Sequence, residues 1–358
     1  MTSEPTTRKL TRRHVLAASA AAAAGSFITP VRAAPPEPTK ITPALIEAAK
    51  KEGKFSWYTS VDLALAEKVA KAFEARYPGV TMKVERSGAE RNFQRIGQEF
   101  QNRIYNCDVV NSSDAAHLIV WKRAKMLAPF VPEDVAQYFP AAHKDPDGMF
   151  ASWRITLCPI AYNTKLVKAE DAPKSYADLL DPKWSGKLVK AHPGYSGTIM
   201  TATQQLSRDL GWSWFEKLAK QKVMQVQSAT EPPKKLAQGE RAVMADGGEY
   251  VAEELKTRGE PVEIVYAAEG TPLITGPSAI MANAPNPNAA RLFHAWSMTR
   301  EAQQLNIDVG ALRSAHPQAV DRPDMKKFSD IKLMREEASV VADQADALKA
   351  QYVKYFKV

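Results

Sequence analysis

Residues 192–201, HPGYSGTIMT, place hydroxyl groups and glycines where the chain could bind an anion. They follow a short apolar run at 186–190 and lead into a segment with helical periodicity, which predicts a strand, a glycine-rich turn and a helix. The first turn of a helix has backbone N–H groups without partners in the helix, and these attract negatively charged oxygen. We therefore expect an anionic group of a ligand to be held by Tyr195, Ser196, Gly197 and Thr198.

Four arginines lie in or near other segments that could face the same ligand: Arg86, Arg91, Arg95 and Arg154. The guanidinium group offers a planar fork of donors that matches carboxylate or phosphate. Arg154 precedes a long apolar run and Arg91 opens a helical segment, so ligand contact and exposure to water are equally open for both. Arg95 falls within the helical segment, which favours exposure to water.

A second candidate group is Glu249-Tyr250, which follows Asp246-Gly247-Gly248. Carboxylate and phenolate are hard oxygen donors that suit a hard cation. A glutamate at a helix start also complements the helix dipole, and a tyrosine can be half-buried with only its hydroxyl hydrogen-bonded. The pair therefore fits either a ligand site or a local structural role.

The sequence carries none of the catalytic motifs GxSxG, HExxH, Walker A or GxGxxG. Its six histidines are scattered, and none has cysteine or aspartate partners at metal-ligand spacing. We therefore expect a binding protein without a cofactor, and not an enzyme.

Strand and helix patterns alternate along the chain, which predicts an α/β fold. Strands at 54–60, 81–87 and 107–113 alternate with helices at 64–79, 90–103 and 115–127, as in a parallel sheet with helices on both faces. A second unit follows, with an amphipathic helix near 338–354 after it. Its expected strands are 153–165, 186–192, 223–227, 242–246, 261–268 and 276–283.

Loops rich in small polar residues follow successive strands of both units. Ligands of open parallel sheets bind beyond the carboxyl ends of the strands, so these loops are expected to line one cleft. Beyond the 192–201 turn, the candidate ligand-binding residues in these loops are Tyr58, Thr59, Ser60, Ser87, Gly88, Arg91, Ser112, Ser113, Asp114, Asp246, Glu249 and Tyr250, with Arg154 beside them.

Residues 1–33 resemble an export signal. Arg12-Arg13 precedes an alanine-rich run that is too short to span a membrane well, and Val31-Arg32-Ala33 favours cleavage before Ala34. The arginine pair is typical of a Tat signal, and a Sec signal with a chance arginine pair is the alternative. No second long apolar segment follows, so we expect no stable membrane insertion.

The charge of the remaining chain is close to balanced. Residues 1–33 hold five of the 48 Lys and Arg residues and one of the 40 Asp and Glu residues, which leaves 43 basic against 39 acidic residues. No basic run is interleaved with aromatic residues, so nucleic acid is not an expected partner. Cys107 and Cys158 fit either a disulfide of an exported protein or two buried free thiols.

The order of WYTS, KVERSG, CDVVNSSDAA, IAYNTK, DPKWSGKL, HPGYSGT, GERAVMADG and GPSAIMANAPNPNAARLF resembles the periplasmic substrate-binding proteins of ABC importers. The chain is most similar to the ferric-ion-binding group of type II binding proteins. The resemblance implies a monomer in the periplasm with an inner-membrane permease and its ATPase as partners. It also implies two lobes, each a mostly parallel sheet flanked by helices, joined by two crossover strands near 155–163 and 276–283. Lobe 1 would comprise 34–158 and 277–320, lobe 2 would comprise 159–276, and a helical tail at 321–358 would brace them.

The resemblance also bears on the ligand. Ferric binders of this group use adjacent tyrosines with a histidine and a glutamate; here Tyr250 matches one tyrosine, while Glu249, Asp62 and Ser113 stand at the other positions. If iron is bound, the ligand set is Asp62, Glu249 and Tyr250. The departures favour a small organic anion carrying carboxylate or phosphate. Three alternatives remain. The ligand is a thiamine-type cation bound near the aromatic residues Trp57, Tyr58, Trp153 and Tyr266, or the protein is a sensor-coupled receptor, or it is a periplasmic enzyme.

Overall fold

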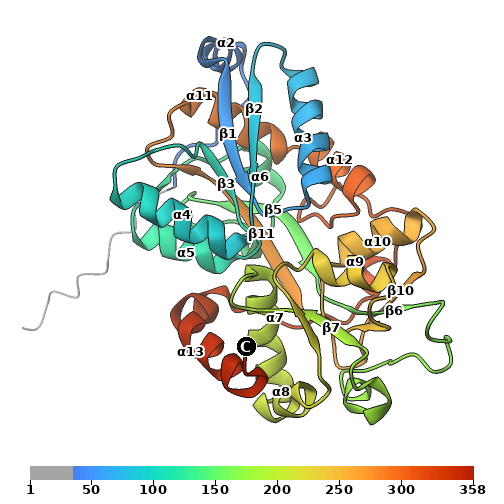
Figure 1. Ribbon diagram of the computed structural model, residues 1–358. Helices are drawn as coiled ribbons and strands as arrows, with labels where there is room; N and C mark the ends of the chain where they lie inside the picture. Colours follow the sequence, from blue (N-terminus) through green and yellow to red (C-terminus); the bar gives the residue numbers. More distant parts are fainter. Residues whose placement is uncertain (1–34) are drawn as a thin grey trace, which may run out of the picture. The chain divides into compact units, whose positions relative to one another are not determined.

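The computed structural model describes residues 35–358, which form two β-sheets flanked by helices (Figure 1). The expected signal peptide at 1–33 lies outside the described residues. In the part that is described, no helix is both long enough and apolar enough to cross a membrane.

The first sheet has the order β2-β1-β3-β11-β4, with β5 paired to β11. Strand β1 pairs in parallel with β2 and β3, whereas β11 is antiparallel to β3, β4 and β5. The strands are β1 (Lys54–Thr59), β2 (Thr81–Arg86), β3 (Val109–Asn111), β4 (Leu127–Ala128), β5 (Ala151–Leu157) and β11 (Leu273–Met281).

The second sheet has the order β10-β6-β9-β7-β8. Strand β7 is parallel to β8 and β9, while β6 is antiparallel to β9 and β10. Both sheets are therefore mixed: β11 in the first sheet and β6 in the second run against their neighbours, while the other strands of each sheet share one direction. The strands are β6 (Ile160–Asn163), β7 (Leu188–Ala191), β8 (Met224–Val226), β9 (Val243–Met244) and β10 (Val262–Val265).

The single strand expected at 153–165 is two strands that belong to different sheets. Strand β5 ends at Leu157 and β6 begins at Ile160, because Pro159 between them has no N–H to continue a ladder. Strand β5 pairs along β11, with a shift of register between Gly276 and Pro277. Strands β5 and β11 run side by side through the middle of the molecule (Figure 1).

Local capping fixes where several helices begin. The side chains of Thr42, Asp62, Asp114 and Ser196 each accept a backbone N–H in the first turn of the helix that follows. Helix α2 was not predicted from the sequence, although Thr42 and Pro43 are a favourable start. The helices around the first sheet are α2 (Pro43–Glu52), α3 (Leu63–Arg76), α4 (Ala89–Gln101), α5 (Ala115–Arg123), α6 (Glu133–Tyr138), α11 (Pro287–Ser297) and α12 (Arg300–Gly310).

The second sheet has its own helices and its own core. Aromatic side chains fill this core, among them Tyr176, Trp214, Phe215 and Tyr352. Full burial of each such side chain contributes about 2–3 kcal/mol. Cys107 and Cys158 are both buried and free. The helices are α7 (Gly197–Leu210), α8 (Trp212–Ala219), α9 (Glu231–Ala237), α10 (Glu249–Thr257) and the C-terminal α13 (Ala338–Phe356).

A buried ion pair attaches α13 to the second sheet. The ammonium of Lys190 on β7 lies 3.2 Å from a carboxylate oxygen of Asp246 and donates to the hydroxyl of Tyr352 at 2.9 Å. Burial raises the pKa of Asp246, and the nearby Lys190 opposes that shift. Asp246 was expected to contact the ligand; it does not line the pocket described below and instead neutralises a buried lysine.

We predict that Asp246→Ala destabilises the protein, because it leaves the Lys190 ammonium buried without a counter-charge. The expected loss in the free energy of unfolding is about 3 kcal/mol, measured by urea denaturation. Lys256→Ala is the matched control, since Lys256 and Glu263 form an exposed pair at 2.6 Å, and its removal should cost at most about 1 kcal/mol. Equal losses in the two variants would contradict a structural role for Asp246.

Candidate functional site

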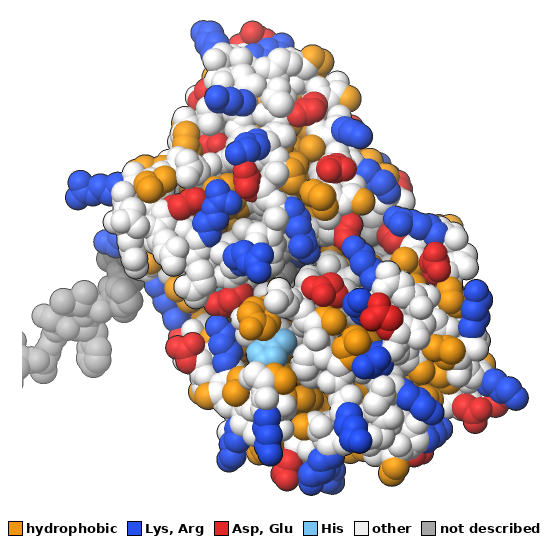
Figure 2. All heavy atoms as spheres, viewed as in Figure 1, with side chains coloured by type: hydrophobic (Ala, Val, Ile, Leu, Met, Phe, Trp, Pro, Cys, Tyr) orange, Lys and Arg blue, Asp and Glu red, His pale blue; other side chains and the backbone are white. Residues whose placement is uncertain are grey.

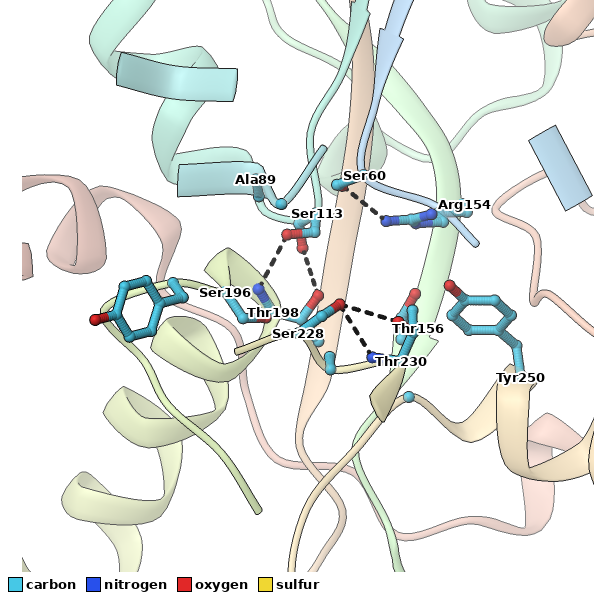
Figure 3. Close-up of a pocket in the computed structure, with 14 residues that line it drawn as sticks. Ser60, Ala89, Ser113, Arg154, Thr156, Ser196, Thr198, Ser228, Thr230 and Tyr250 are labelled. Atoms are coloured by element: carbon cyan, nitrogen blue, oxygen red, sulfur yellow. Dashed lines mark hydrogen bonds between the residues drawn. The ribbon is translucent and has the colours of Figure 1, made fainter. Parts of the chain in front are cut away.

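A pocket lies between the two sheets and is lined from both (Figure 3). It contains about 340 Å³ not filled by protein atoms, open solvent included. The surface in Figure 2 is hollowed at the junction of the two halves, with Lys and Arg side chains above the hollow and Asp and Glu side chains among those below it. No carboxylate lines the pocket; its residues are Ser60, Gly88, Ala89, Ser113, Arg154, Thr156, Tyr195, Ser196, Thr198, Ser228, Ala229, Thr230, Gly248 and Tyr250.

Arg154 on β5 places a buried guanidinium in this pocket. The residue is 2% exposed, and Nη2 donates weakly to Ser60 Oγ at 3.4 Å. Its Nε and Nη1 atoms have no hydrogen-bond partner among residues 35–358. Burial lowers the pKa of Arg154, but arginine stays protonated because its ordinary pKa is above 12. The pocket therefore contains a positive charge that the described protein residues do not neutralise.

The sequence around Arg154 gives its side chain room. A Cβ atom at Gly276 on the paired strand β11 would lie 2.8 Å from Arg154 Nε and 2.9 Å from its Cγ. Glycine at this position therefore lets the arginine side chain lie across β11. The guanidinium carbon is 6.0 Å from the centre of the Tyr250 ring, which also lines the pocket.

Tyr250, in the first turn of α10, offers a hydroxyl and not a phenolate. Burial raises its pKa, and the nearby Arg154 opposes the shift. The hydroxyl oxygen accepts the backbone N–H of Asp62 at 3.1 Å, so its own proton remains to be donated. A neutral phenol that donates a hydrogen bond suits an oxygen-rich ligand better than it suits a metal ion.

Arg86 adds a second positive charge beside the pocket. Its Nε donates to the carbonyl of Val61 at 3.2 Å, and its Nη2 donates to Ser228 Oγ at 3.3 Å. The Arg86 charge is close enough to Arg154 to lower the pKa of that residue further. Arg86 thus joins the end of β2 in the first sheet to the loop after β8 in the second.

Three hydroxyl-bearing residues of the pocket were missed by the sequence analysis. Ser228 and Thr230 lie in the loop after β8, with their oxygens 3.0 Å apart. That loop follows a predicted strand, so the rule applied to the other loops would have found it. Thr156 lies within β5, and its buried hydroxyl has no hydrogen-bond partner in the part of the chain that is described. A residue inside a strand carries no sequence signal of this kind.

The turn before α7 lines the pocket but does not present the free amides that we expected. Thr198 N donates to Ser113 Oγ at 3.1 Å, and Thr198 Oγ1 donates to the Ser113 carbonyl at 3.3 Å. Ser196 caps its own helix by accepting the N–H of Ile199 at 3.4 Å. The expectation that these helix amides hold the ligand is therefore wrong for Thr198 and Ile199, while Tyr195, Ser196 and Thr198 still face the pocket.

Eight of the predicted residues line the pocket together. The other nine do not line it: Tyr58, Thr59, Ser87, Arg91, Ser112, Asp114, Gly197, Asp246 and Glu249. The Tyr58 hydroxyl donates to Glu99 at 3.3 Å, and the Tyr58 ring packs in a buried cluster with residues of α4 and α5. Arg91 is exposed. The backbone N–H of Ser87 extends the ladder by donating to the carbonyl of Thr59 at 3.0 Å.

Three others bond within the first sheet and the loop after it. The hydroxyl of Thr59 donates to Asn111 Oδ1 at 3.2 Å, and Ser112 Oγ lies 2.9 Å from His117 Nδ1. Asp114 caps α5 by accepting the N–H of His117 at 3.0 Å. These side chains hold the loops in place and leave the neighbouring Ser60 and Ser113 to face the pocket.

Of the three candidate iron ligands, Tyr250 lies next to Asp62, but basic side chains engage the carboxylates of both Asp62 and Glu249. Both carboxylate oxygens of Glu249 accept hydrogen bonds from Arg313, at 2.9 and 3.0 Å, and one also accepts from the Tyr266 hydroxyl at 2.5 Å. The Asp62 carboxylate pairs with Lys234 at 2.7 Å. Among residues 35–358, no group of three or more His, Cys, Asp or Glu side chains is arranged to hold a metal ion.

Comparison with known proteins agrees with the fold. Residues 68–333 match the family described as bacterial extracellular solute-binding protein. A probable ABC transporter periplasmic-binding protein of Sinorhizobium fredii is 24% identical over 237 residues, which is 63% of this chain and 64% of that protein. The family match and the solved structures below confirm the expected relationship and the two-sheet α/β fold class.

Two solved structures illustrate the likeness. The periplasmic binding protein AfuA from Actinobacillus pleuropneumoniae, with exogenous fructose-6-phosphate bound, has a TM-score of 0.79 and 25% identity, covering 86% of this chain and 99% of that one. Iron-bound HitA from Pseudomonas aeruginosa has a TM-score of 0.72 and 22% identity, covering 84% and 99%. The second likeness shows the fold alone.

We predict that Arg154→Met stabilises the ligand-free protein, because it removes a buried charge that lacks a carboxylate partner. The expected gain in the free energy of unfolding is about 1 kcal/mol, measured by urea denaturation after refolding has removed any retained ligand. Arg313→Met is the matched control, since Arg313 is as buried but paired with Glu249, and its loss should cost about 3 kcal/mol. A loss of the same size in Arg154→Met would show that Arg154 serves the fold.

Proposed function

The chain belongs to the bacterial extracellular solute-binding proteins, and we propose that it binds a small organic anion in the pocket around Arg154. Membership of this family confirms the expected solute-binding role and the expectation that the protein is not an enzyme. The observation that carries the proposal is the buried guanidinium of Arg154, whose Nε and Nη1 lack partners in the described part of the chain.

The charge around the pocket favours an anion over a cation. Arg154 lines the pocket, Arg86 lies beside it, and no aspartate or glutamate is among the lining residues. A charge-assisted hydrogen bond to a buried guanidinium is roughly twice as strong as a neutral one. A thiamine-type cation would instead place two positive charges together, and the aromatic residues Trp57, Trp153 and Tyr266 do not line the pocket.

The hydroxyl groups favour a ligand that is rich in oxygen. Ser60, Thr156, Ser228 and Thr230 line the same pocket as the guanidinium, and the Tyr250 hydroxyl can also donate there. This set suits a phosphate or carboxylate group attached to a polar body such as a polyol. The fructose-6-phosphate bound to AfuA supports a phosphate ester as the first ligand to test.

We propose that the ligand is captured in the periplasm and passed to an inner-membrane ABC permease and its ATPase, as the name of the Sinorhizobium relative indicates for that protein. In this proposal the protein is a monomer whose lobes, 34–158 with 277–320 and 159–276, close on the ligand. The tail from 321 braces them: Lys349 on α13 pairs with Glu90 on α4 at 3.1 Å, while Tyr352 is bound to the second sheet. Loss of uptake of the same anion in a deletion strain would separate this role from that of a sensor-coupled receptor.

We predict that the purified protein binds fructose 6-phosphate with a dissociation constant of about 1 µM or below, measured by isothermal titration calorimetry. Arg154→Met should weaken binding at least about 100-fold, because the anion loses its buried partner. Arg95→Met is the matched control: Arg95 pairs with Glu85 and Glu99 away from the pocket, so this variant should bind as the wild type does.

Inorganic phosphate, citrate, thiamine and ferric citrate complete the titration series. Binding of citrate in place of the phosphate ester would keep the anion proposal and change the ligand class. Binding of thiamine or of iron alone, or unchanged binding in Arg154→Met, would contradict the proposed site.

A further inference from the structure

The first residue of α7, Gly197, lies directly against the carboxylate of Asp114. A Cβ atom built on Gly197 would be 1.7 Å from Asp114 Oδ2, 2.8 Å from its Cγ and 3.0 Å from Ser113 Oγ. Asp114 is 1% exposed, so the carboxylate is enclosed at this position. Any side chain at position 197 would overlap with it.

This contact joins the two sheets. Asp114 lies in the loop after β3 of the first sheet, and Gly197 follows β7 of the second. The hydrogen bonds between Ser113 and Thr198, at 3.1 and 3.3 Å, lie next to it along the chain. Figure 3 shows the Ser113–Thr198 pair on one side of the pocket and Tyr250 on the other. The contact therefore lies next to one edge of the pocket, which Ser113 and Thr198 form.

Position 197 requires glycine because a side chain would overlap with Asp114, and not because the backbone conformation excludes other residues. Gly197 is not among the glycines with positive φ, so alanine is compatible with its backbone. In a helix without close neighbours, alanine is more stable than glycine by about 0.5–1 kcal/mol. What alanine lacks here is room for its methyl group beside Asp114.

The charge of Asp114 also suits this position. Negative charge is stabilised at the N-terminus of a helix, and α7 has 14 residues. An anionic group of the ligand was expected at this helix end; the protein's own carboxylate lies there instead. The ligand anion is then left to Arg154.

We propose that Asp114 is an internal closing group, a positioning residue that seats against Gly197 when the two halves meet and raises the population of the closed arrangement in the ligand-free protein. The effect on ligand affinity rests on the proposed function, whereas the contact itself does not. The absence of a side chain at position 197 is what permits the contact.

Hydrogen exchange of the ligand-free protein tests the contact directly. Thr198 N is in the first turn of α7, where no helical acceptor exists, so its protection depends on Ser113 across the pocket. In Gly197→Ala the Thr198 amide should exchange at least about tenfold faster than in the wild type. Gly97→Ala is the matched control, because Gly97 lies in α4 and its Cβ would meet nothing within 4 Å. Equal Thr198 exchange in Gly197→Ala and wild type would overturn the proposal.

A second substitution separates this overlap from other effects of the alanine. Asp114→Gly removes the carboxylate, and glycine at a helix N-cap costs only a few tenths of a kcal/mol. The double variant Asp114→Gly/Gly197→Ala should therefore exchange at Thr198 more slowly than Gly197→Ala alone. If it exchanges as fast as the single variant, Asp114 is not the group that alanine displaces and the proposal is wrong.

Titration with fructose 6-phosphate links the contact to binding. Gly197→Ala should weaken binding at least about tenfold, because the closed arrangement becomes less populated, while Gly97→Ala should not. Wild-type protein that binds no anion, yet shows the expected exchange pattern, would refute the proposed function and support the closing contact. Wild-type binding that Gly197→Ala leaves unchanged would support the proposed function and refute the role of the contact in affinity.

Discussion

A positive charge buried without a counter-charge is costly, and the pocket of this protein is arranged around one. Arg154 comes from β5, the strand of the first sheet that leads into β6 of the second, and its fork of donors shares the pocket with hydroxyl groups and a neutral tyrosine. Two other buried cations, Lys190 and Arg313, each lie within 3.2 Å of a carboxylate. The chain therefore neutralises buried charge where it serves the fold and leaves it unpaired in the pocket. That difference distinguishes the proposed binding site from the rest of the interior better than burial or residue type does.

Much of the fold could be predicted from the sequence, because strand and helix periodicities are local. The errors came from features that depend on distant segments. Nothing local indicates that β11 enters the first sheet between β3 and β4 in the opposite direction, so the sheets are mixed. The break between β5 and β6 had a local signal in Pro159, but the apolar run on both sides concealed it. Helix α2 had a favourable cap and proline and was missed beside the stronger pattern that follows it.

The candidate site was predicted at the level of loops and not of side chains. Placing ligands beyond the ends of strands brought Ser60, Ser113 and Tyr250 together correctly. Their neighbours turn away because consecutive side chains at a strand end or helix start point in different directions. Whether Glu249 faces the pocket depends on Arg313, which is 64 residues further along the chain. A single sequence gives no means of pairing these two residues.

The strand order of the first sheet also constrains the order of folding. The second sheet is made from one continuous stretch, between Ile160 and Val265, and can pair its strands as soon as that stretch exists. The first sheet begins with β1, yet β3 and β4 are joined only through β11, which comes after the whole second sheet. Until β11 arrives, one edge of β3 is unpaired and open to pairing with other chains. During synthesis the first sheet is therefore begun first and completed last, and the open edge of β3 needs protection from aggregation in the meantime.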